Sequence, residues 1–198
     1  MLLFWLIGRT SDVKVRLSHS QNRSEIVETL NKEQLAAKVL QNNPKLSKDN
    51  AMLIASSVIK AVRYWEAKTK IKSPLPYHVY FGIIHVESRY NSKAASSASA
   101  RGLMQVTPIW QGKLPLYAAD ADMFDPVKNI HSGVGILFHY AKTVKALYRR
   151  DPTHPCWCYT DLLKATLACY NAGPTGMQKG RGRDYVEKVL KAADLYKL

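Results

Sequence analysis

Apolar residues recur at steps of three and four along most of this chain, and this periodicity constrains its fold more than any other feature. Such spacing gathers apolar side chains on one face of an α-helix, whereas a half-buried strand would alternate strictly between apolar and polar residues. Strand-like alternation is scarce, and no internal repeat is present. The sequence therefore predicts a mainly α fold with very little β-structure.

Two helices are expected in the first third of the chain. One begins after Ser24 and is broken at 42–44, which read Asn-Asn-Pro. The next begins near Ser47, a residue type that caps helix N-termini. Its inner face carries Met52, Ala55, Val58, Ile59, Val62 and Trp65. The proline-containing segment 73–76 then predicts an extended link.

Four further helices are expected. The first covers about 77–88, and the Gly-, Ser- and Ala-rich stretch after it predicts loop or short strand as far as Pro108. A long helix should follow Asp125-Pro126, because proline is favourable in a first turn. Its apolar stripe is Ile130, Val134, Leu137, Ala141, Val144 and Tyr148. The last two helices should cover 161–172 and 184–196, with Gly173-Pro174 predicting the end of the former.

The 198 residues suffice for a single hydrophobic core. We expect an apolar start and basic arm or linker over 1–23, and one domain over 24–198 with a helical extension at 24–46 and a core at 47–196. The apolar run 2–7 is far shorter than the roughly 20 residues of a spanning helix. It lacks the flanks of a cleaved secretory signal. Contact with a membrane surface and simple packing both stay open for it.

A formal net charge of +14 predicts an anionic partner. Nucleic acid, anionic lipid and the carboxylate-bearing bacterial cell wall would all qualify, but no nucleic-acid module is recognisable, so we expect no nucleic acid as partner. Two basic clusters would suit the cell wall, although clusters of this kind are usually solvated faces. They are Lys142, Lys145, Arg149 and Arg150, and Lys179, Arg181 and Arg183.

The three cysteines cannot all pair within one chain, because their number is odd. Segment 154–158, His-Pro-Cys-Trp-Cys, places three potential metal ligands in five residues, but its spacing matches structural zinc sites poorly. An aromatic-rich loop between helices is the interpretation that we favour. We expect neither a metal nor another cofactor.

Glu87 shares one face of the helix expected at 77–88 with apolar residues. Tyr80, Ile83, Ile84 and Glu87 lie at positions i, i+3, i+4 and i+7. A carboxyl group removed from water has a raised pKa, so near neutral pH it can donate the proton that glycoside cleavage requires. The alternative is a structural glutamate at a helix end that pairs with Arg89 or reaches solvent.

The residues after Glu87 favour the catalytic interpretation. The run 87–91 (Glu-Ser-Arg-Tyr-Asn), Ala94, Ser96 and the run 102–108 (Gly-Leu-Met-Gln-Val-Thr-Pro) resemble the signature of the soluble lytic transglycosylase family. Further blocks resemble the same family in the same order: 124–130 with Gly133, 168–174 and, more weakly, 185–189. The resemblance covers about 47–196. It implies a lysozyme-like α+β fold, peptidoglycan glycan strands as substrate and action in the cell envelope.

The resemblance also implies roles for individual residues. Glu87 would be the catalytic acid and base. Six residues would bind substrate, with Ser96 near the reacting sugar and the others around the cleft: Ser96, Met104, Gln105, Tyr170, Asn171 and Tyr185. The sequence departs from the family pattern at Ser92, Ser99 and 178–184, and the last departure concerns Tyr185 most directly.

No Asp or Glu occurs between Ser88 and Ala119, so a second catalytic carboxylate would have to come from Asp120, Asp122, Asp125 or beyond. With one carboxyl group, the 2-acetamido group and the 6-hydroxyl of the sugar can complete the reaction and leave a 1,6-anhydro-MurNAc end. A hydrolytic muramidase of goose-lysozyme type is the alternative enzyme. A non-catalytic wall-binding or assembly module of a phage particle or secretion machine is the alternative of another class.

Overall fold

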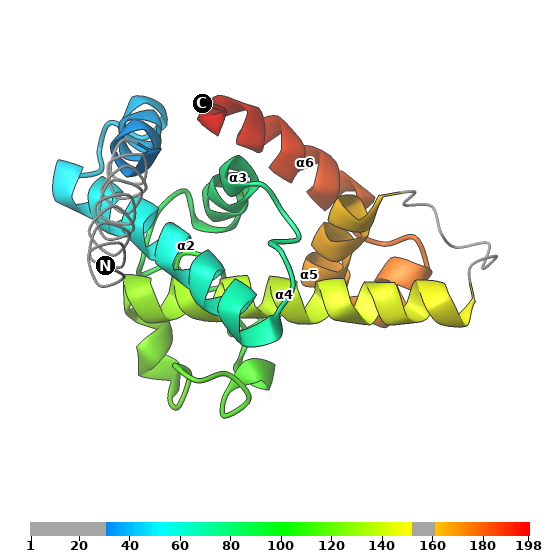
Figure 1. Ribbon diagram of the computed structural model, residues 1–198. Coiled ribbons are helices and arrows are strands. Elements are labelled where there is room, and N and C mark those ends of the chain that lie inside the picture. The colour runs from blue at the N-terminus through cyan, green and yellow to red at the C-terminus, as the bar shows by residue number, and fades with distance from the viewer. Residues whose placement is uncertain (1–30, 152–160) are drawn as a thin grey trace, which may run out of the picture.

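The computed structural model describes residues 31–151 and 161–198, which form a helical bundle (Figure 1). A first helix covers 31–42. The longer helices after it are α2 (Lys48–Thr69), α3 (Tyr77–Ser88), α4 (Pro126–Arg150), α5 (Leu162–Gln178) and α6 (Arg183–Ala193). Three short 3-10 helices complete the set: η1 (Pro108–Trp110), η2 (Asp120–Phe124) and η3 (Asp194–Tyr196). In the described ranges, β-structure is limited to isolated bridges within 95–106, which confirms the mainly α prediction.

The predicted helix starts are confirmed by their caps. The Ser47 hydroxyl accepts a hydrogen bond from the Asn50 backbone N–H at 3.2 Å. The Asp125 carboxylate accepts one from the Lys128 N–H at 2.8 Å, with Pro126 in the first turn of α4. These side chains satisfy N–H groups that have no partner within the helix, which determines where each helix begins.

The predicted break at Gly173-Pro174 is confirmed, but a second helical segment follows it directly, which the sequence did not predict. Gly173 adopts φ 68° and ψ 168°, which breaks the helical path, but the chain resumes a helix that continues to Gln178. Pro174 is tolerated because it stands in the first turn of the resumed segment, where its missing N–H would have no partner within the helix. The helix predicted over 184–196 likewise divides into α6 and the 3-10 turn η3.

The long helix α4 is the centre of the packing, with α2 and α5 against it, while α3 packs against α6 and η3 (Figure 1). Close approach to α4 depends on glycine: a Cβ on Gly135 would lie 2.4 Å from the Trp65 ring. Helix 31–42 adds Leu35, Ala36 and Val39 to the same core.

Among the helices in the described ranges, none combines the length and the apolar character that crossing a membrane requires. The expectations for residues 1–30, including membrane contact through 2–7, lie outside the described residues.

Candidate active site

The end of α3 presents Glu87. Tyr80, Ile83 and Ile84 are fully buried, as their shared helix face predicts. The helix ends because Arg89 and Tyr90 take positive φ values of 49° and 65°, which turn the chain sharply after Ser88. Tyr90 is buried, and its hydroxyl donates to the Phe81 carbonyl at 3.2 Å, so this uncommon backbone conformation is held in place by the core.

Glu87 meets Tyr185 from α6. The Tyr185 hydroxyl donates a hydrogen bond of 2.6 Å to Glu87 Oε1. Burial raises the pKa of Glu87 to about 7, and the hydrogen bond from Tyr185 opposes part of that rise. Near neutral pH, therefore, the carboxyl group can both donate and accept a proton.

Tyr170, on α5, is the second tyrosine near the acid. Its hydroxyl donates to the Met104 backbone carbonyl at 2.7 Å. Burial, followed by the charge of Glu87, raises the pKa of Tyr170 well above its usual value. The fold thus brings Glu87, Tyr170 and Tyr185 together from three helices, and both phenols stay protonated at neutral pH.

The segment from Gly102 to Gln105 forms a tight turn beside these side chains. The Met104 side chain is fully buried against α4, where a Cβ on Gly133 would lie 2.5 Å from its sulfur. The carbonyl of Met104 therefore meets Tyr170, while its thioether belongs to the core. Gln105 adopts φ 48°, and its amide donates to the carbonyls of Gly102 at 3.0 Å and Ala94 at 3.3 Å.

Two other predicted residues are exposed. The Ser96 hydroxyl accepts a hydrogen bond from the Ala100 N–H at 3.1 Å and so closes a turn. Asn171 lies on α5 just before the kink at Gly173. Their roles in substrate binding, like those of Met104, Gln105 and Tyr170, stay predictions.

Asn129, in the first turns of α4, is a positioning residue that the sequence analysis missed. It is fully buried, its amide donates to the carbonyls of Arg101 at 2.8 Å and Met123 at 2.9 Å, and its oxygen accepts from the Met104 N–H at 2.7 Å. In the sequence Asn129 is an amide in the block 124–130, next to the apolar stripe of α4, and this position alone does not show that the side chain is buried.

The acids considered as a second catalytic carboxylate support the start of α4. Asp122 accepts hydrogen bonds from Lys128 Nζ at 2.6 Å and from the N–H groups of Ala118 and Ala119. These contacts lower the pKa of Asp122 to about 2. Asp125 caps α4, and the side chain of Asp120 lies outside the described residues.

Across 31–151 and 161–198, no three His, Cys, Asp or Glu residues cluster as metal ligands would. Segment 154–158 lies outside these ranges. Cys169 is buried on α5, and burial raises the pKa of its thiol to about 12, so it is not a reactive thiolate at neutral pH.

The described residues thus form a mainly helical domain in which a partly buried acid, Glu87, stands at the end of the core helix α3. Residues 63–191 match the family described as Transglycosylase SLT domain, and the chain belongs to this family.

The chain is also similar to two individual proteins. The chain is 35% identical over 99 residues to the membrane-bound lytic murein transglycosylase C of Mannheimia succiniciproducens, an alignment that covers 46% of this chain and 26% of that protein. The chain thus spans about a quarter of that relative's length. It also resembles the crystal structure of the 70 kDa soluble lytic transglycosylase SLT70 from Escherichia coli, with 20% identity and a TM-score of 0.43, over 75% of this chain and 30% of the other.

Proposed function

We propose that this protein is a peptidoglycan lytic transglycosylase that cleaves the β-1,4 bond between MurNAc and GlcNAc. The observation that carries the proposal is the buried Glu87 carboxyl group, whose pKa of about 7 suits proton transfer in both directions. Membership of the SLT family and similarity to a lytic murein transglycosylase support the same activity.

In the proposed reaction, protonated Glu87 donates its proton to the glycosidic oxygen as the bond from that oxygen to C1 of MurNAc breaks. The 2-acetamido oxygen stabilises the positive charge at C1. The 6-hydroxyl oxygen of the same sugar then bonds to C1, and its proton passes to the Glu87 carboxylate. The products are a free GlcNAc 4-hydroxyl and a 1,6-anhydro-MurNAc end. Glu87 regains its proton, and no water is consumed.

The positions of the nearest acids in sequence favour this route over hydrolysis. Both hydrolytic mechanisms in common use need a second carboxylate near the reacting sugar. Asp122 and Asp125 are held by hydrogen bonds at the start of α4, whereas Glu87 accepts a hydrogen bond from Tyr185 and affects the ionisation of Tyr170. A single-carboxyl mechanism matches this arrangement.

The substrate would place the activity in the cell envelope. The high positive charge would hold the anionic wall, so turnover should fall as salt screens the attraction. Contact of residues 2–7 with a membrane surface, and association with a phage particle or secretion machine, are further proposals from the sequence.

The deciding experiment is digestion of purified peptidoglycan followed by mass analysis of the products. We expect anhydro-ended fragments from the native chain and a loss of about a hundred- to ten-thousand-fold in Glu87→Gln. Glu33→Gln, an exposed change on helix 31–42, should retain native turnover. Reducing-end muramic acid would instead identify a hydrolase, and binding to the wall without release would identify a non-catalytic module.

A further inference from the structure

A pocket lies beside α4, between the C-terminal end of α2 and the turn at η1. Its volume is about 180 Å³. The walls are largely aromatic and include Trp65, Trp110 and Phe138, while Lys113 and Lys142 bring ammonium groups to it. Trp65 is anchored at the back, because its indole N–H donates to the His131 carbonyl at 2.9 Å.

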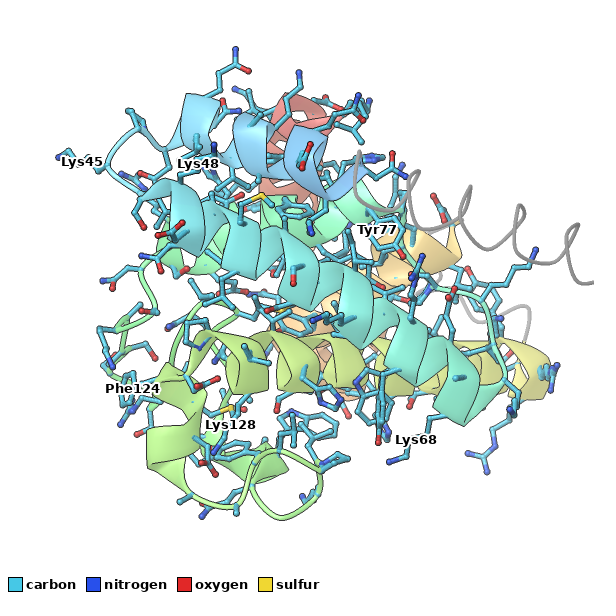
Figure 2. The ribbon with its side chains drawn as sticks, turned by 60° about the vertical axis from the view of Figure 1, so that its left-hand side comes forward. Lys45, Lys48, Lys68, Tyr77, Phe124 and Lys128 are labelled. Atoms are coloured by element: carbon cyan, nitrogen blue, oxygen red, sulfur yellow. The ribbon has the colours of Figure 1, made fainter. Side chains whose placement is uncertain are left out.

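The charged residues that line this pocket are two lysines. None of the residues that line it is acidic, and both lysines are exposed. A third cation, Lys68, lies 5.0 Å from the centre of the Trp65 ring, and Figure 2 shows it at the end of α2 remote from Lys48. Apolar walls beneath unopposed cations suit a ligand that combines aliphatic groups with carboxylates.

The pocket is lined in part by α4, which packs against α5, the helix that carries Tyr170. Tyr170 is close enough to Glu87 and to Tyr140 that both affect its ionisation. The Tyr140 ring in turn packs edge to face on the Trp110 ring, with centroids 5.6 Å apart. Trp110 is therefore shared between the neighbourhood of the active site and the pocket.

The size of the pocket indicates what could enter it. Pockets for drug-sized ligands are commonly about 300–1,000 Å³, so 180 Å³ suits the end of a short peptide.

We propose that the pocket formed by Trp65, Trp110, Lys113, Phe138 and Lys142 binds a carboxylate-bearing end of the stem peptide on the strand being cleaved. This inference rests on the proposed function, since it assigns that enzyme peptide-bearing strands as its preferred substrate. The stem peptide is attached to muramic acid, and its carboxylates would meet the two lysines while its aliphatic parts pack on the indole rings.

Binding is tested first without catalysis. The native chain is titrated with the sugar-free tetrapeptide released from purified peptidoglycan by an amidase, and the indole N–H signals are followed by NMR. We expect the Trp110 signal to shift in the native chain and to shift much less in Lys113→Gln/Lys142→Gln. Lys45→Gln/Lys48→Gln removes the same charge at the other end of α2 and should respond like the native chain (Figure 2).

Turnover is then compared on peptide-bearing strands and on strands stripped by the amidase. We expect the pocket variant to raise KM about three- to tenfold on peptide-bearing strands, as for the loss of two exposed ion pairs, with no change on stripped strands. The control variant Lys45→Gln/Lys48→Gln should change KM equally on peptide-bearing and stripped strands, or leave it unchanged on both.

The outcomes separate the two proposals. Equal native turnover on both kinds of strand with an unshifted Trp110 signal would overturn the pocket and leave the transglycosylase intact. A shifted Trp110 signal without cleavage of any strand would support the pocket and overturn the transglycosylase proposal. If an unrelated peptide of equal negative charge binds as well as the stem peptide, the pocket is a site for an acidic protein segment, and the inference is wrong.

Discussion

Glu87 at the end of α3 is partly buried and Asn129 at the start of α4 is fully buried, and the hydrogen bonds of these two polar side chains differ. Asn129 uses both amide hydrogens and its oxygen in hydrogen bonds to backbone groups. Glu87 has one side-chain hydrogen bond, from Tyr185, to offset the burial of its charge. Asn129 therefore holds the turn at 102–105 in place, whereas the Glu87 carboxyl group can exchange its proton near neutral pH.

The comparison distinguishes a residue that stabilises the fold, Asn129, from a residue suited to proton transfer, Glu87. A satisfied amide contributes stability and carries no charge, so it can hold the turn that presents the Met104 carbonyl to Tyr170. A carboxyl group with too few partners costs stability when ionised, and that cost is what brings its pKa close to neutrality. Three experiments would break or sharpen this comparison.

The largest effect is expected from Asn129→Ala. It leaves the Met104 N–H and the Met123 carbonyl without this partner, while the Arg101 carbonyl still accepts from the Val106 N–H, so the free energy of unfolding should fall by about 4 kcal/mol. Urea denaturation measures the loss. Asn50→Ala, on the exposed surface of α2, should change stability by less than about 0.5 kcal/mol. Similar losses in the two variants would refute the supporting role of Asn129.

Glu87→Gln should have the opposite effect on stability, and only at higher pH. The pKa of Glu87 is 4.5 unfolded and about 7 folded, so protonation stabilises the fold fully below pH 4.5, and that contribution is lost as pH rises through 7. Glutamine has no charge to bury, so the variant should match the native chain at pH 4 and exceed it by about 3 kcal/mol at pH 8. Parallel stability curves across pH 4–8 would contradict the raised pKa.

Tyr185→Phe tests the smaller contribution of the hydrogen bond to Glu87. Because this bond lowers the pKa of Glu87 against the effect of burial, its removal should move the alkaline limb of the pH–activity profile upward by about one unit. The exposed Tyr64→Phe on α2 is the matched control and should leave the profile unchanged. A Tyr185→Phe profile that changes in height but not in position would show that the phenol does not tune the acid.

Local patterns accounted for most of the helices. The caps Ser47 and Asp125 mark real helix starts, and the apolar stripe of α4 is buried as predicted from Ile130 to Val144. At Gly173-Pro174 the local signals predicted the break in the helix correctly, but they did not show that a second helical segment follows and continues to Gln178.

The candidate site was predictable in part. Glu87 was singled out by its place on an apolar face together with the family resemblance of the residues after it. Tyr185 lay in the weakest block of that resemblance, yet it is the residue that donates a hydrogen bond to the acid. Asn129 went unnoticed because a buried amide cannot be told from an exposed one until its partners on the 101–104 turn and at Met123 are known.

The sequence by itself determined the helical periodicity, the caps and the solitary acid in the stretch from Glu87 to Ala119, because these depend on residues a few positions apart. Only the tertiary structure decided that Tyr185, 98 positions from Glu87, would donate to its carboxylate, and that the Met104 carbonyl would accept from Tyr170. The raised pKa of Glu87 is likewise a tertiary property, since removal from water depends on the helices that pack around the carboxyl group.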